Sequence, residues 1–213
     1  SYTSNVGKLR NKGFEFYATV FLMKKPEGVT WSISGTVLHN KNKIIETSKA
    51  LKDAQKTLQG NQYNAEQLYI EGYSSNAIWV VKSLGIDPST GKELYLSADG
   101  SPTYTWNAGD VTSVGTTDPK IWGSLNTMVR YKGLTFTAAL SYKLGGQTYN
   151  RTLADRVETG NYSFNVDQRV FTGRWQKPGD IVPFKGLLNT TPTYKTSRFV
   201  QDENTFYARN FNI

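Results

Sequence analysis

The sequence predicts an all-β fold: a segment of a transmembrane antiparallel β-barrel with long loops at one end of its strands. Two observations predict it. Four windows alternate apolar and polar side chains, and each is about as long as the ~9–11 residues with which a tilted strand crosses a bilayer, whereas globular strands usually have ~5–6. The links inside each pair of windows are short, and the segments that follow the pairs are very long.

The first pair of windows predicts a hairpin over residues 13–40. Even positions from Phe14 to Leu22 are apolar, and odd positions from Val29 to Val37 are apolar or Gly. Alternation with a period of two is typical of a strand whose two faces meet different surroundings. Residues 25–28 between the windows (Lys-Pro-Glu-Gly) have the composition of a tight turn. We therefore expect two antiparallel strands here.

The second pair predicts a hairpin over residues 121–144, with a turn at Lys132-Gly133. Its apolar positions again recur at every second residue, from Leu134 to Leu144 in the later window. The tail 204–213 has the same alternation and is predicted to be a further, partial strand.

Between and after the hairpins lie two long segments, 41–120 and 145–203, which we expect to be extracellular loops. Short turns at one end of the strands and long loops at the other are typical of outer-membrane barrels. A soluble sandwich usually has short links at both ends. The lopsided connections therefore favour a membrane barrel over a sandwich.

The first long segment contains local structure. Ser48 is predicted to cap a short helix that ends near Gly60. Residues 87–91 (Asp-Pro-Ser-Thr-Gly) space oxygen atoms somewhat as a calcium loop does, but a turn that begins at the Pro is the favoured interpretation. A short strand is predicted over 92–96.

Composition excludes several classes of function. The 213-residue chain has no Cys, so disulfide scaffolds, thiol catalysis and Cys-bound zinc are excluded, and with one His we do not expect a His-rich metal site or a His-based triad. Because no paired carboxylates or phosphate-binding loop stand out either, we expect no enzyme activity, no cofactor and no metal. The net charge is +8, but the basic residues are scattered, and we expect no nucleic-acid partner.

Six strings in the chain occur in the order that one family uses. The most specific is 82–91 (Lys-Ser-Leu-Gly-Ile-Asp-Pro-Ser-Thr-Gly). The full set is residues 11–15, 40–44, 82–91, 118–119, 174–180 and 196–200. Over nearly its whole length, the chain resembles the C-terminal barrel portion of the SusC/RagA-type TonB-dependent outer-membrane transporters of Bacteroidetes.

This resemblance implies a multi-pass protein of the bacterial outer membrane, in which residues 1–213 supply part of a 22-stranded barrel wall in contact with lipid. It implies TonB-dependent import of oligosaccharides or peptides beneath a SusD-like surface lipoprotein. The TonB complex would act through a plug domain that this chain does not contain, so we expect the chain to be an internal piece of a longer protein.

Aromatic and polar residues of the long segments are the predicted substrate contacts. Tyr104, Trp106 and Trp175 offer flat rings on which sugar C–H faces can stack, and Asp110 and Arg174 offer hydrogen bonds. The alternative for each residue is packing within its loop. An alternative for the whole chain is a secreted all-β glycan-binding module, which would be stable without detergent.

Overall fold

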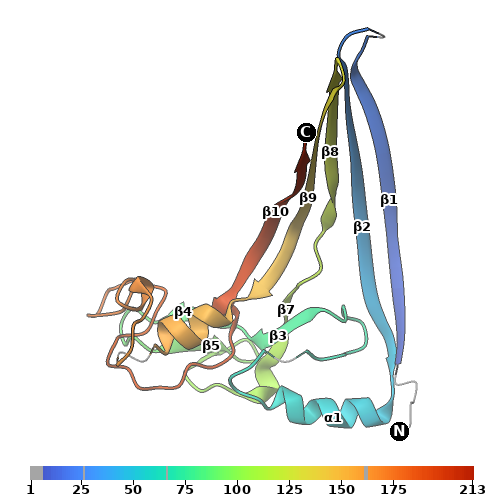
Figure 1. The fold of residues 1–213 in the computed structure, drawn as a ribbon. Helices are drawn as coiled ribbons and strands as arrows, with labels where there is room; N and C mark the ends of the chain where they lie inside the picture. Colours follow the sequence, from blue (N-terminus) through green and yellow to red (C-terminus); the bar gives the residue numbers. More distant parts are fainter. Residues whose placement is uncertain (1–6, 26, 66, 161–162) are drawn as a thin grey trace.

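The structure is a computed structural model that describes residues 7–25, 27–65, 67–160 and 163–213. Its largest element is a five-stranded antiparallel sheet with the order β1-β2-β8-β9-β10. The strands are β1 (Gly7–Lys24), β2 (Thr30–Thr47), β8 (Ile121–Tyr131), β9 (Leu134–Tyr149) and β10 (Val200–Asn212). Figure 1 shows a tall wall with the two hairpin turns at one end and the remaining chain gathered at the other.

The strands extend beyond the predicted windows. β1 and β2 pair from Gly7 opposite Thr47 to Lys24 opposite Thr30, and β10 begins at Val200 rather than at residue 204. Pro26 of the predicted turn lies outside the described residues. The other turn has positive φ at both central residues, +45° at Lys132 and +86° at Gly133, as a two-residue hairpin of type I′ requires.

The register divides the side chains of the sheet between two faces, because neighbours along a strand point to opposite sides. One row across all five strands reads Ala18, Gly35, Leu125, Leu140 and Ala208. The adjacent row, on the opposite face, reads Thr19, Ser34, Asn126, Ala139 and Asn210. We call these the apolar face and the polar face. The edge strand β1 departs from the pattern, since Tyr17 and Phe21 lie on the polar face.

The apolar face is exposed. Phe16 retains 61% of its accessible surface and Leu134 retains 67%, and Val20, Phe136 and Leu140 are also exposed. In a β-sandwich these side chains would be buried against a second sheet. No helix in the described ranges is long and apolar enough to cross a membrane.

The prediction of a β-rich fold is confirmed, since strands dominate the described residues and helices are few. Within these residues the sheet is open: β1 and β10 are its two edges and do not pair with each other. The described part of the chain therefore does not form a closed barrel.

Most of the other described residues form what we call the loop body, the described residues of 48–120 and 150–199. It has a two-stranded sheet, β3 (Ala77–Val81) and β7 (Val111–Thr116), and a three-stranded sheet, β4 (Ser83–Ile86), β5 (Glu93–Leu96) and β6 (Pro102–Thr103). Its helical segments are α1 (Lys49–Gln59), η1 (Ala108–Asp110), η2 (Leu153–Glu158), η3 (Gln168–Val170) and η4 (Ser197–Phe199).

The local elements predicted in the first long segment are present in the loop body. Ser48 Oγ accepts a hydrogen bond from Leu51 N at 3.2 Å, and Gly60 ends the helix, so the predicted cap is confirmed. β5 corresponds to the strand predicted over 92–96.

The two long segments, predicted as separate loops, pack into one unit. Val81 forms a parallel bridge with Thr196, and Lys195 N donates to the carbonyl of Gln62 at 2.7 Å. Apolar clusters form its core: Leu153, Ala154, Val157 and Phe199; Leu68, Ala77 and Trp79; Val81, Tyr95 and Trp106. The loop body thus has the buried core that the sheet lacks.

Candidate functional site

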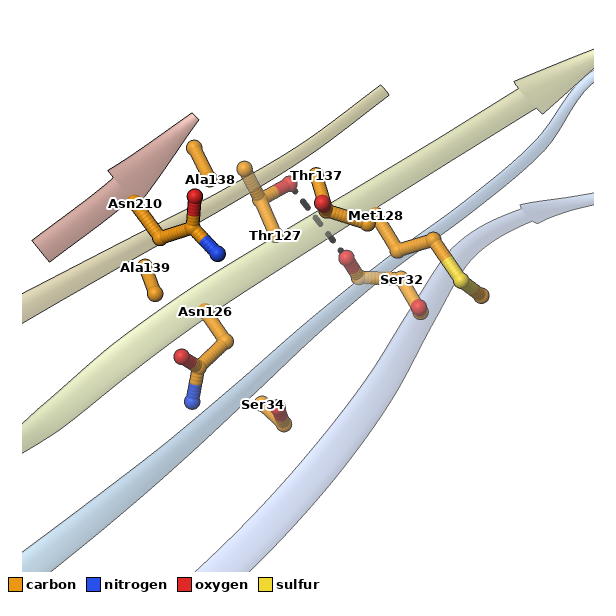
Figure 2. A pocket seen from close by; sticks show the side chains of 9 residues that line it. All are labelled: Ser32, Ser34, Asn126, Thr127, Met128, Thr137, Ala138, Ala139 and Asn210. Carbon is orange, nitrogen blue, oxygen red and sulfur yellow. Dashed lines mark hydrogen bonds between the residues drawn. The ribbon is translucent and has the colours of Figure 1, made fainter. Parts of the chain in front are cut away.

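The polar face of the sheet carries a shallow hollow of about 140 Å³ between β2, β8, β9 and β10 (Figure 2). Its lining residues are Ser32, Ser34, Asn126, Met128, Thr137, Ala139 and Asn210 of the polar face, with Thr127 and Ala138, whose side chains belong to the opposite face. The polar side chains in this lining are Ser, Thr and Asn, whose hydroxyl and amide groups offer both donors and acceptors without net charge. The hollow thus carries no charged side chain.

Charged residues of the polar face lie in the rows between this hollow and the loop body. Glu15 and Lys143 share one row of the sheet with Trp122 between them, and Arg209 Nε donates to Ser141 Oγ at 2.8 Å. The face is thus hydrophilic along β8 and β9, which suits contact with water rather than with hydrocarbon.

In the loop body, Tyr104 lies beside the turn over residues 87–91. The Tyr104 hydroxyl donates to Asp87 Oδ2, and Asp87 also accepts from Ser89 N and from Thr90 Oγ1, both at 2.8 Å. These bonds, that of Tyr104 above all, hold the pKa of Asp87 well below its usual range. The structure thus has the predicted turn here, with donors from the protein on both oxygens of the Asp87 carboxylate.

Trp175 contacts the same turn from the other long segment. Its indole Nε1 donates to the carbonyl of Pro88 at 2.9 Å. Gly91 has φ of +69°, and a Cβ at this position would come within 2.5 Å of Trp175 Cδ2. The ring therefore packs closely on the backbone of the turn, and only a Gly fits beneath it. Tyr104 and Trp175 are thus brought together around residues 87–91.

The other three predicted substrate contacts form hydrogen bonds within the loop body. Trp106 is buried, its Nε1 donates to the carbonyl of Lys195 at 3.3 Å, and its ring stacks on Tyr194 at 5.8 Å. Asp110 Oδ1 accepts from the backbone of Ala98 at 2.8 Å.

Arg174 is also buried, and its guanidinium is surrounded by backbone carbonyls. Nε donates to Val170 O at 2.8 Å, Nη1 donates to Lys185 O at 3.2 Å, and Nη2 donates to Val157 O. The arrangement ties three segments of the second long connection together. The five predicted residues therefore do not form one cluster, and a role in substrate contact remains a prediction for each of them.

Sequence reasoning missed a buried ionic cluster of Glu93, Glu158, Lys185 and Arg198. Arg198 Nη2 lies 2.8 Å from Glu93 Oε2, Arg198 also pairs with Glu158, and Lys185 Nζ lies 3.7 Å from Glu158 Oε1. Burial opposes the charge of Arg198, but the hydrogen bonds to Glu158 and Glu93 prevail and raise its pKa above the usual range. Burial lowers the pKa of Lys185. No local spacing joins residues so far apart in the chain.

No group of three or more His, Asp or Glu side chains in the described part of the chain could hold a metal ion.

Comparisons with known proteins give a fold but no family. No family model matches the chain, and no curated protein matches it. The fold is similar to that of solved structures of the RagAB peptide transporter, with a TM-score of 0.76 and 19% sequence identity over 97% of this chain. Structures of the RagAB peptide importer in its closed-closed and open-open states give TM-scores of 0.76 and 0.73 at the same identity. The chain spans 23% of the length of the first of these chains.

Proposed function

We propose that this chain is the wall and loop segment of a bacterial outer-membrane nutrient importer of the SusC/RagA type. The five strands of the sheet would cross the outer membrane as part of a 22-stranded barrel, with the loop body outside the cell. The single observation that carries the proposal is the exposed apolar face of an open sheet, opposite a face that is polar.

The dimensions of the sheet support this interpretation. Apolar side chains recur on β9 from Leu134 to Leu144. At ~3.3 Å per residue and a strand tilt of ~40°, this stretch projects to roughly 25 Å on the membrane normal, which equals the apolar band of outer-membrane barrels. Among the described residues, the edge strands β1 and β10 each pair with a strand on one side only, as expected for a segment of a larger barrel.

The fold similarity to a peptide importer supports nutrient transport and favours peptides over oligosaccharides as cargo. It also supports a SusD-like lipoprotein as partner of the loop body, because the RagAB structures contain two components by name. Coupling to the TonB complex would pass through a plug domain that is not among residues 1–213. The proposal includes no catalytic step.

Within this function, the exposed rings of the loop body are the best candidates for substrate contact. Tyr104 is 50% exposed, and Trp175 is half-buried against the same turn. Replacing either by Ala should weaken uptake of cargo, whereas replacing buried Trp106 should act through folding of the loop body. Uptake of a labelled peptide, compared with the amount of folded protein at the surface, separates these two effects.

Labelling of single cysteines tests the orientation and the membrane position together, because the chain has no Cys of its own. We choose Leu188→Cys in the loop body and Glu27→Cys at the hairpin turn, both at exposed positions. In intact cells that carry the complete protein, a membrane-impermeant maleimide should label the first variant and label the second only after the outer membrane is opened.

Equal labelling of both positions in intact cells would contradict the proposal. It would favour the secreted glycan-binding module, for which a monomer that stays folded without detergent is also expected.

A further inference from the structure

Beyond the apolar face, the outward side of β1 and β2 carries four basic residues in two directly opposed pairs. Arg10 lies opposite Lys43, and Lys12 lies opposite Lys41. All four are exposed, whereas Asn42 between the two lysines of β2 is buried, which fits the alternation of sides along the strand. We call these four residues the cation quartet.

The quartet lies on the same side of the sheet as the apolar face. The register runs without interruption from Lys12 opposite Lys41 to Phe14 opposite His39 and Phe16 opposite Val37. Two residues along a strand correspond to ~7 Å. The charges therefore begin about 7 Å beyond the last aromatic pair, on the surface that faces away from the polar face.

This arrangement is unfavourable for the isolated chain. Like charges that face each other across two strands destabilise the pairing. In the described part of the chain, none of the four forms an ion pair with a carboxylate. The nearby carboxylate of Asp118 is engaged elsewhere, since it accepts from Asn42 at 2.8 Å and from Ser74 at 2.6 Å.

A hollow of about 420 Å³ adjoins the quartet. Lys41 and Lys43 line it together with His39 and Lys120, and the His39 ring is fixed by a contact of 2.6 Å between Nδ1 and the carbonyl of Lys120. Asp118 also lines the hollow, but its carboxylate already accepts from Asn42 and Ser74, so the lysines remain as partners for an anion and the volume has room for a polar head group. Arginine and lysine together suit phosphate, which Arg binds through paired N–H groups and Lys binds as a point charge.

We propose that the cation quartet binds the phosphate groups of lipids in the outer leaflet of the membrane. This inference rests on the proposed function, which puts the apolar face in hydrocarbon and the quartet at the depth of the head groups. The phosphate groups of such a lipid would contact the four basic side chains, and its acyl chains would lie against the apolar face. The lipid then relieves the repulsion between the paired cations and fixes how deep the wall sits in the membrane.

The test uses the complete protein purified in neutral detergent and reconstituted into phosphatidylcholine vesicles, with lipid A as the phosphorylated probe. The test variant is the double substitution Lys12→Gln and Lys41→Gln. The control variant removes the same charge at the opposite end of the strands, Lys24→Gln with Lys132→Gln. Binding of fluorescent lipid A should weaken roughly 20-fold in the test variant and stay unchanged in the control.

The unfolding temperature is a second readout, and the direction of its change distinguishes lipid binding from a structural role of the quartet. In neutral detergent without lipid, the test variant should unfold at a higher temperature than the wild type, because one opposed pair of like charges is gone. Added lipid A should raise the unfolding temperature of the wild type more than that of the variant. Dephosphorylated lipid A should have no such effect.

Three outcomes would overturn the inference: equal lipid A binding by test and control variants, equal stabilisation by dephosphorylated lipid A, or full replacement of lipid A by inorganic phosphate. Failure of the wild type to insert into vesicles at all would instead refute the proposed function. The two failures are therefore distinguishable.

Discussion

Phe199 and Phe206 lie close together in the chain, yet 1% of Phe199 and 73% of Phe206 is exposed. The first belongs to the loop body, and the second lies on the apolar face of the sheet. The comparison shows that the exposed fraction of a Phe side chain changes from almost none to most of it within a few residues of the chain. The loop body removes its apolar side chains from water by packing, whereas the sheet presents them in register to its surroundings. The two regions therefore differ in what covers their apolar side chains, and under the proposed function the sheet is covered by lipid.

Charged residues divide in the same way. The loop body buries Glu158 and Arg198 as partners, while the strands carry charge on the polar face and beyond the apolar rows. A buried ion pair tolerates no loss of one partner, whereas a surface charge is dispensable. The largest effects on the loop body are thus expected from its ionic cluster, and those on the sheet from charge placed on its apolar face.

The largest effect is expected from Arg198→Met. This substitution removes the arginine partner of the buried carboxylates of Glu93 and Glu158, which should cost about 3–5 kcal/mol of loop-body stability. Hydrogen exchange of the backbone amides in residues 150–199 should accelerate, while exchange in β1 and β2 should not change. The matched control is Arg151→Met, which breaks an ion pair with Asp155 that is exposed on both sides and is worth ~0–1 kcal/mol.

Similar exchange rates in the two variants would mean that the ionic cluster does not hold the loop body together.

Next in size is Leu140→Arg on the apolar face. A cation at the midplane of the bilayer costs ~2–4 kcal/mol, so we expect the complete protein to assemble poorly in the outer membrane. The control is Ala139→Arg, one residue away on the polar face and beside the hollow. Ser141 is less suitable because it already accepts a hydrogen bond from Arg209. Resistance of the folded protein to detergent in gels, measured for both variants, should distinguish them, and equal loss would contradict the assignment of faces.

This division between regions also decides what the sequence could predict. The strands of the hairpins follow from alternation with a period of two, and the capped helix after Ser48 follows from local rules. Both depend on neighbours in the chain. The ends of the strands were less predictable: β2 continues to Thr47, where it still pairs with β1, and Ile44 also forms hydrogen bonds with residues 72 and 73, which no local pattern indicates.

The assembly of the loop body was not predictable from the sequence for the same reason. Trp106 and Arg174 are residue types common in binding sites, but their burial depends on Lys195 and Val157, which lie in other segments. Tyr104 and Trp175 were named as separate candidates, and their meeting at the turn over 87–91 needed the fold. An alternating pattern predicts the strands of the sheet, but it does not predict how the two long connections pack against each other.

A smaller effect on the sheet is expected from Gly123→Ala. Tyr142 reaches across this glycine, and its hydroxyl donates to the carbonyl of Thr36 at 2.9 Å. A Cβ on Gly123 would collide with that carbonyl and lie 2.9 Å from the Tyr142 hydroxyl, so the strands must shift, at a cost of about 1–3 kcal/mol.

The control is Gly35→Ala, where the nearest atom would lie at 3.4 Å. Urea unfolding of the protein in lipid vesicles should give a lower midpoint for the first variant than for the second. A larger loss at Gly35 would contradict the register that pairs β2 with β8.

The smallest effect is expected in the loop body, where a substitution should change the pKa of Asp87. Since the hydroxyl of Tyr104 is the main cause of the low pKa of Asp87, Tyr104→Phe should raise that pKa. A carboxyl whose pKa is lowered by folding stabilises the fold above its unfolded pKa of ~3.9, and this contribution is lost as the pH falls toward the folded value. The wild-type turn over 87–91 should therefore stay closed to a more acidic pH than the turn of the variant.

Carbon-13 NMR of the Asp87 carboxyl group, followed from pH 5 downward, measures the shift directly. Tyr63→Phe, which changes an exposed ring with no contact to Asp87, is the control and should leave the titration unchanged. If Tyr104→Phe also leaves it unchanged, the hydroxyl does not bind Asp87 in solution. Tyr104 would then be free to turn toward a ligand. The loop body would in that case contain a residue that is neither packed like Phe199 nor permanently exposed like Phe206, because it would leave its contacts when a ligand binds.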